Sequence, residues 1–268
     1  MASSLGVYGL VYDDQTTLQL AYDQMRIFRD TLLQPSGLMA HIYDYDQMNF
    51  GDGNVWVTGN GWAAAGMLRV LASIVQSSHA KEMVQQRTDL YSWVTQLLDA
   101  AYTNVSTDAT TGQWHNYMNN TDSFTDSSGS MLLAYSTFRL ASMCASGAAG
   151  GNVSTTHIEA AERIYQAIQG HMVPMGHFDN SITTVNALNF ATPGPTSGEA
   201  LAFVLMLASA RRDYAANNVT GFDGPGTNGN APPQVDAGKP PSAPPNDNPA
   251  PAITSLKQIS EESGSHRA

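Results

Sequence analysis

Residues 55–66 read Val-Trp-Val-Thr-Gly-Asn-Gly-Trp-Ala-Ala-Ala-Gly, and this stretch decides the fold that the rest of the chain must support. Apolar residues then recur at helical spacing and predict a helix over about 62–76 with one buried face: Met67, Val70, Leu71, Ile74 and Val75. The Thr-Gly-Asn-Gly segment before it predicts a sharp turn, in which Thr58 or Asn60 caps the first free amides of the helix. Trp56 and Trp62 flank this turn and have two interpretations, as plugs of the hydrophobic core or as platforms for a sugar ring.

The composition excludes several classes of partner. Of 268 residues, 12 are Lys or Arg and 23 are Asp or Glu, so the net charge is −11 and the pI is near 4.8. This balance argues against nucleic-acid binding, which needs clustered basic side chains. No run approaches the roughly 18 apolar residues of a membrane span, so no membrane partner is expected. No motif indicates a cofactor, and the oligomeric state is left open.

Signals of cellular location are weak. Cys144 is the only cysteine, so no internal disulfide can form. The first residues lack a basic start followed by an apolar core, and no signal peptide is visible. Four glycosylation sequons, at Asn104, Asn119, Asn152 and Asn218, are close to the number that this composition gives by chance. The location is extracellular if a full-length form carries a signal peptide.

Six helical segments alternate in character along the chain. Three are amphipathic (14–34, 88–102 and 157–170), and three are nearly uncharged (62–76, 126–145 and 199–210). A helix that is apolar on all sides must be buried, whereas an amphipathic helix can shield it from water. No segment predicts a convincing strand. The fold class is therefore all-α, with an inner layer of helices inside an outer one.

The loops repeat as well. Small polar residues open each apolar helix, at 58, 126 and 196, and these starts lie 68 and 70 residues apart. The spacing predicts a helical hairpin of about seventy residues that occurs three times. A glycine and then a histidine (His41, His115 and His177) follow each amphipathic helix. Because the long loops all join outer to inner helices, they should gather at one end, where a site is expected.

The composition changes at Phe222. Nine of the 13 prolines lie between Pro225 and Pro251, among Gly, Asn and Asp. Such a segment buries too little apolar surface to fold. We therefore expect a helical domain over 1–221 and a disordered tail over 222–268.

Residues 56–67 closely resemble the W-x-x-G-N-G-W-A-A-x-G-M run of glycoside hydrolase family 105, the six-hairpin glycosidases related to unsaturated rhamnogalacturonyl hydrolases. Supporting segments are Ser-Gly-Leu-Met-Ala-His at 36–41, Asp-Ser-Ser-Gly-Ser at 126–130 and Ser-Gly-Glu-Ala at 197–200. The resemblance covers about residues 5–216, and this version is similar to the fungal members. It implies an α/α toroid of six hairpins, of which about three are present. It also implies hydrolysis of a terminal unsaturated uronic acid from pectin-derived oligosaccharides.

In the chemistry that the resemblance implies, an aspartic acid protonates the C4=C5 double bond of the sugar and water adds at C5. His41 matches the family's substrate-contacting histidine, and Trp56 and Trp62 match its two site tryptophans. Thr58 and Asn60 lie between the two tryptophans in the sequence. All five residues, His41, Trp56, Thr58, Asn60 and Trp62, are therefore expected to bind substrate. The family often has an arginine, suited to the substrate carboxylate, where this chain has Thr58. The family's catalytic aspartate precedes the point where this chain starts, so no catalytic residue is assigned and an inactive form is one expectation.

Other polar residues are expected to have structural roles. Asp13 and Asp14 should cap a helix, Asp126 another, and Glu199 should complete a capping box. Asp44, Asp46 and Asp52 should form a solvated acidic loop. The three loop histidines lack the spacing of a metal triad, so no metal site is expected. The loops 37–60, 112–130 and 174–198 contain no Lys or Arg, which predicts weak affinity for acidic sugars or a preference for neutral ones.

Three functional hypotheses remain open. The first is a pectin-side-chain glycosidase that acts on an oligosaccharide substrate. The second is a non-catalytic carbohydrate-binding fragment, favoured by the missing acid and by Thr58. The third is another α/α-toroid enzyme, a glucoamylase-like hydrolase or a sugar epimerase, which would use Asp126 or Glu199 as acid or base.

Overall fold

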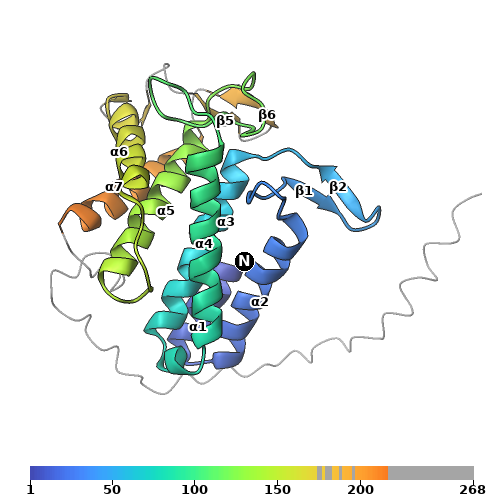
Figure 1. Cartoon of the computed structure of the whole chain (residues 1–268), viewed down its shortest axis with the longest axis vertical. Coiled ribbons are helices and arrows are strands. Elements are labelled where there is room, and N and C mark those ends of the chain that lie inside the picture. Colours follow the sequence, from blue (N-terminus) through green and yellow to red (C-terminus); the bar gives the residue numbers. More distant parts are fainter. Residues whose placement is uncertain (174–176, 179–182, 187–188, 195–196, 217–268) are drawn as a thin grey trace, which may run out of the picture. The chain divides into compact units, whose positions relative to one another are not determined.

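The computed structural model describes residues 1–173, 177–178, 183–186, 189–194 and 197–216. The predicted disordered tail, 222–268, lies outside them. The helices of this part of the chain are α1 (Ala2–Val11), α2 (Gln15–Leu32), α3 (Val57–Gln76), α4 (Val84–Asn104), α5 (Ser127–Ala145), α6 (Thr155–Gln169) and α7 (Gly198–Ala215), with a short 3-10 helix, η1 (Ser78–Lys81) (Figure 1).

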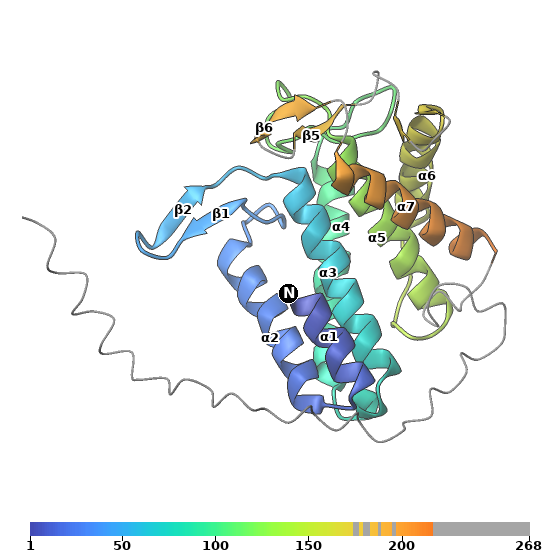
Figure 2. The ribbon, with the colours of Figure 1, turned by 180° about the vertical axis from the view of Figure 1, so that it is seen from behind.

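The helices form the two predicted layers. In the inner layer, α1 packs on α3, α3 on α5, and α5 on α7. Each outer helix packs on the inner helix that precedes it, α2 on α1, α4 on α3, and α6 on α5. Outer helices α4 and α6 lie in front in Figure 1, and inner helices α1, α3 and α7 lie in front when the molecule is turned (Figure 2). The all-α, α/α-toroid type of fold is confirmed.

Helix α1 was not predicted. Its sequence, Ala-Ser-Ser-Leu-Gly-Val-Tyr-Gly-Leu-Val, has no polar stripe and therefore shows no helical period. A Cβ on Gly9 would lie 2.8 Å from the Leu18 side chain, so this glycine lets α1 and α2 approach closely. The alternation of uncharged and amphipathic helices therefore begins one helix earlier than expected.

The expectation that no segment forms a strand is wrong for the loops. Antiparallel pairs join β1 (Ile42–Asp44) to β2 (Asn49–Asp52), β3 (Met172–Val173) to β4 (His177–Phe178), and β5 (Thr184–Asn186) to β6 (Asn189–Gly194). The longest of these strands, β6, reads Asn-Phe-Ala-Thr-Pro-Gly, which does not alternate between apolar and polar residues. The first hairpin, β1–β2, extends from the end of α2 (Figure 1).

Burial follows the apolar character of the inner helices, with one exception. Sixteen of the 19 residues of α5 are buried, as expected for a helix enclosed by α3, α6 and α7. Helix α7 buries Phe203 and Leu207, but Leu205 is 71% exposed, so the prediction of burial on all sides is wrong for this helix. Its far side has no described element packed on it. Within the described residues, no helix is long and apolar enough to cross a membrane.

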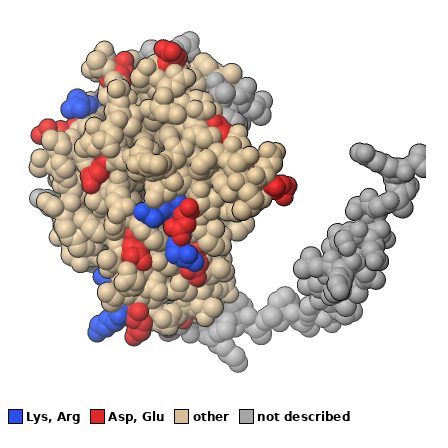
Figure 3. All heavy atoms as spheres, turned by 45° about the vertical axis from the view of Figure 1, so that its right-hand side comes forward, with Lys and Arg blue, Asp and Glu red and all other residues tan. Residues whose placement is uncertain are grey.

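Ion pairs fasten α7 to its neighbours. Arg139 Nη1 on α5 lies 2.8 Å from Asp213 Oδ2 on α7. Arg211 on α7 donates from Nε and Nη2 to the Glu162 carboxylate on α6, at 2.7 and 2.8 Å. Elsewhere charges are sparse, and much of the face in Figure 3 carries neither acidic nor basic side chains.

Candidate functional site

The Thr-Gly-Asn-Gly segment is helical, and the predicted turn is wrong. Helix α3 begins at Val57, with Trp56 as an N-cap whose side chain makes no capping bond. Gly61 is needed for helix packing, because a Cβ at this position would lie 2.6 Å from Leu132 Cβ on α5. Likewise a Cβ on Gly129 would lie 2.6 Å from the Thr58 nitrogen. These two glycines let the first turns of α3 and α5 touch.

Thr58 joins the same two helices through its hydroxyl. Thr58 Oγ1 donates to Asp126 Oδ2 at 2.5 Å, and the Asp126 carboxylate also accepts from the backbone amides of Ser128 and Gly129, at 2.8 and 3.3 Å. Asp126 is therefore the N-cap of α5, as predicted, whereas Thr58 is not a cap. Both side chains are buried, and burial raises the pKa of Asp126 against the opposing effect of these hydrogen bonds.

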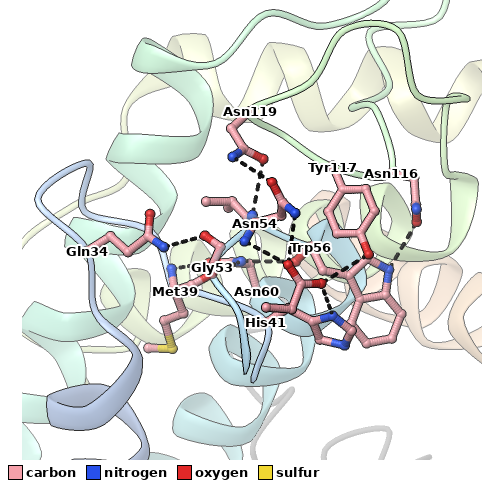
Figure 4. Close-up of polar contacts among 12 residues, drawn as sticks. Gln34, Met39, His41, Gly53, Asn54, Trp56, Asn60, Asn116, Tyr117 and Asn119 are labelled. Atoms are coloured by element: carbon pink, nitrogen blue, oxygen red, sulfur yellow. Dashed lines mark hydrogen bonds and ion pairs between the residues drawn. The ribbon is translucent and has the colours of Figure 1, made fainter. Parts of the chain in front are cut away.

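Asn60 is likewise not a cap and holds a loop in place. Its Oδ1 accepts from the Met39 nitrogen at 2.9 Å, and its Nδ2 donates to the carbonyl oxygens of Met39 and Trp56, both at 3.0 Å. The side chain is only 1% exposed. Asn60 therefore fixes the segment that leads into His41 against the start of α3 (Figure 4).

His41 is oriented by an aspartate from β2. His41 Nδ1 donates to Asp52 Oδ2 at 2.9 Å, and the imidazole centroid lies 4.7 Å from that of Trp56. Asp52 also accepts from the Asn54 amide at 2.9 Å and from the Tyr117 hydroxyl at 3.2 Å. Burial opposes ionisation, but the hydrogen bonds, led by that from His41, lower the pKa of Asp52. Its prediction as a solvated loop residue was wrong.

Trp56 is held on two sides. Its Nε1 donates to Asn116 Oδ1 at 3.0 Å, and its ring lies over Gly59, where an added Cβ would come within 3.2 Å of Trp56 Cε3. Backbone bonds from Val57 to Asn116 and from Met118 to Val55 bring the loop 105–126 to the same place. The loops after α2 and α4 therefore meet at one end of the helices, as expected (Figure 1).

A cavity of about 560 Å³ opens beside this end of α3. His41, Trp56 and Trp62 line it, while Thr58 and Asn60 do not. Trp62 is 46% exposed and meets the edge of Phe203, with centroids 4.9 Å apart. The complete described lining is Met1, Ala2, Ser3, Ser4, Met25, Phe28, Leu32, Met39, Ala40, His41, Trp56, Gly59, Trp62, Ala63, Ala65, Gly66, Met67, Arg69 and Met206.

Arg69 has the one permanently charged side chain in the described lining, and none of the side chains there is a carboxylate. Reasoning from the loops missed this arginine because it lies within α3. A signal was available: Arg69 is the only charge on that helix, and it follows Trp62 by seven residues, two turns of an α-helix.

The other predicted polar residues have structural partners. Asp14 caps α2 through Thr17, but Asp13 instead accepts from the Ser78 hydroxyl. Ser197 caps α7 by accepting from the Ala200 amide, so Glu199 stands one position too early for a capping box. Asp46 does lie in the exposed turn of the β1–β2 hairpin, and its nitrogen donates to Oδ1 of the half-buried Asp44 at the end of β1.

Two of the three loop histidines, His41 and His115, have described side chains, and each is hydrogen-bonded within its own loop. His115 Nδ1 donates to the Ser123 carbonyl at 2.7 Å, and the side chain of His177 lies outside the described residues. Among the side chains that are described, no three His, Cys, Asp or Glu are placed to hold a metal ion.

With this geometry in hand, comparison with known proteins identifies the family. The sequence profile of Glycosyl Hydrolase Family 88 matches residues 2–190. The chain belongs to glycosyl hydrolase family 88. No curated protein sequence matches it.

Solved structures share the fold of this chain. A possible member of family 105 from Salmonella enterica is 18% identical with a TM-score of 0.63, and the match covers 79% of this chain and 55% of that one. A family 105 glycoside hydrolase from C. acetobutylicum is 14% identical with a TM-score of 0.57, covering 80% and 62%. The unsaturated glucuronyl hydrolase of Bacillus sp. GL1 is 16% identical with a TM-score of 0.55, covering 80% and 57%.

At these identities the likeness shows the fold alone. Together with the family 88 profile, it confirms the resemblance to the six-hairpin glycosidases. The family 88 chain described here spans little more than half the length of these structures.

Proposed function

We propose that this chain is a glycoside hydrolase-like protein whose cavity binds the unsaturated uronyl end of an oligosaccharide, such as one derived from pectin. One observation carries the proposal: His41, Trp56 and Trp62 line a single cavity where two loops meet. Family membership supports it, as does the likeness to an enzyme described as an unsaturated glucuronyl hydrolase responsible for the degradation of glycosaminoglycan.

Each of the three residues has a distinct role in this proposal. The half-exposed indole of Trp62 offers a broad apolar face for a sugar ring, while its edge contact with Phe203 fixes its direction. Trp56 forms a second wall, held by Asn116 and Gly59. His41, oriented by Asp52, hydrogen-bonds a sugar hydroxyl. Thr58 and Asn60 do not contact the sugar in this proposal. They hold α3 and the Met39–His41 segment in position.

Hydrolysis needs an acid that reaches the sugar, and the described lining supplies none. Asp126 is fully buried and accepts three hydrogen bonds as a helix cap, which leaves it no path to a ligand. Asp52 has a lowered pKa and is held ionised by His41. These observations favour a second candidate function, sugar binding without hydrolysis by this chain alone.

Two measurements on one sample test both candidates. An unsaturated uronyl disaccharide is titrated against tryptophan fluorescence, and hydrolysis is followed by the loss of ultraviolet absorbance of its double bond. Binding with stable absorbance identifies a binder, and falling absorbance identifies a hydrolase. A folded protein that binds no such sugar overturns the proposal.

A pair of variants locates the binding. Trp62→Ala should weaken binding by about tenfold, equivalent to about 1.4 kcal/mol. Trp93→Ala is the matched control, because Trp93 stacks on Tyr22 in the outer layer and does not line the cavity. Equal affinities of these two variants would show that the sugar binds elsewhere.

A further inference from the structure

Arg69 is placed to reach the same ligand as Trp62. The two residues are seven positions apart on α3, which puts them on one face of the helix with about 10 Å of axial rise between them. Arg69 lines the cavity together with Trp62 and the first residues of α1, Ser3 and Ser4. Arg69, Ser3 and Ser4 also border a second hollow of about 610 Å³ along α1, so Arg69 lines both spaces.

Arg69 has no acidic partner among the described residues. Its Nη2 lies 3.9 Å from the Met206 sulfur, a weak contact, and the side chain is exposed. Arg139 and Arg211, by contrast, each have an acidic partner: Arg139 pairs with Asp213, and Arg211 pairs with Glu162. Because no described carboxylate competes for it, the guanidinium of Arg69 is available to an anionic ligand.

Arg69 supplies the one permanently charged side chain of the described lining, which also includes His41 and the N-terminal residue, Met1. The described lining contains no Lys and no second Arg. Thr58, which stands where the related glycosidases often have an arginine, is buried and donates its hydroxyl to Asp126. A planar guanidinium is well matched to a carboxylate, because it can donate two parallel hydrogen bonds.

We propose that Arg69 binds the carboxylate of a uronic acid whose sugar chain stacks on Trp62. This inference rests on the proposed function, and it names the residue that selects acidic over neutral sugars. It reverses the expectation of a neutral-sugar preference, which considered only the loops.

The test compares two probes, the unsaturated uronyl disaccharide and its methyl ester, which differ only in charge and in one methyl group. The wild-type protein should bind the acid more tightly than the ester by about tenfold to a hundredfold, as expected for charge-assisted hydrogen bonds. This preference should shrink in high salt, because the site is open to solvent. Arg69→Gln should bind both probes equally, with the affinity for the ester unchanged.

Arg163→Gln is the matched control. Arg163 lies on α6, is exposed, has no acidic partner in the described part of the chain and does not line the cavity. This variant has the same change in net charge as Arg69→Gln and should keep the full preference for the acid.

The outcomes separate the two proposals. If the folded wild type binds neither probe, the proposed function fails. If it binds the ester and the acid equally, or if Arg69→Gln keeps the preference or loses affinity for both probes alike, the role of Arg69 is overturned while sugar binding stands. If Arg69→Gln does not fold, Arg69→Lys decides: it keeps the charge but not the fork, and an undiminished preference contradicts a bidentate contact.

Discussion

Replacing Thr58 by valine removes one hydrogen bond and almost nothing else. Valine has nearly the same shape, so no cavity forms, but the Asp126 carboxylate loses its 2.5 Å bond from the Thr58 hydroxyl. Both side chains are buried, at 3% and 0% exposure, so water cannot replace the lost donor. Removing a hydrogen-bond partner from a buried polar group costs about 1–3 kcal/mol, and we expect Thr58→Val to lower the free energy of unfolding by about 2 kcal/mol.

The effect should depend on pH, with a definite sign. The hydrogen bond from Thr58 lowers a pKa of Asp126 that burial raises above its ordinary value of 3.8. Losing the bond raises the folded-state pKa further, so the variant is penalised most where the carboxylate is ionised. The loss of stability should therefore be full at pH values above the folded-state pKa and shrink as the pH falls through that pKa towards 3.8.

Urea unfolding followed by far-ultraviolet circular dichroism measures this loss, and thermal melting checks it. A loss of about 2 kcal/mol corresponds to a fall in Tm of roughly 4–8 °C for a domain of this size. Thr58→Ser is the control, because it keeps the hydroxyl and removes one methyl group, at a cost of about 0.8 kcal/mol. A valine variant as stable as wild type, or a serine variant less stable than the valine one, would refute the reasoning.

Three further changes test other parts of the structure. Asp52→Asn should weaken sugar binding by about tenfold in calorimetry, because His41 loses its charged partner, and unchanged affinity would contradict this role. The lowered pKa of Asp52 contributes stability that is full above 3.8 and is lost as the pH falls below it, so the variant should also lose less stability than wild type on acidification to pH 3. Trp114→Phe deletes a buried indole N–H that donates to the Ala101 carbonyl at 3.1 Å, and should cost about 2–3 kcal/mol in urea unfolding; an unshifted midpoint would count against it. Burial lowers the pKa of His157, against the attraction of a nearby aspartate, so wild type should lose stability as the pH falls through 6.5. If the Tm of a His157→Gln variant falls as steeply as that of wild type between pH 7 and 5, His157 is not the cause.

The layered helices could be predicted from the sequence because burial leaves a periodic trace. Helices that alternate between apolar and amphipathic character at a spacing of about seventy residues have few other ways to pack. Helix α1 was not predicted, because its ten residues have no polar face. Its lack of charge nevertheless matches the other inner helices. The strands of the loop hairpins were not predicted, because they have two to six residues and show no clear alternation of apolar and polar residues.

The candidate site was only partly predictable, for a different reason. Gly61 serves close packing of two helices, and sequence alone cannot separate that use from a turn, because both need a residue without a side chain. Asp52 and Arg69 depend on partners far along the chain: Tyr117 reaches Asp52 from another loop, and Met206 reaches Arg69 from α7. The motif located the tryptophans and His41, whereas only the structure shows what surrounds them.

The wall of the cavity is rich in methionine, and this makes it vulnerable to oxidants. Met25, Met39, Met67 and Met206 all line the space beside Trp62. Oxidation turns a flexible apolar thioether into a polar sulfoxide, which would roughen a surface suited to sugar rings and add a strong acceptor near Arg69. Met25 and Met206 are partly exposed and should react before the buried Met39 and Met67. Mild peroxide should therefore lower sugar affinity before it unfolds the protein, and methionine sulfoxide reductases should restore it.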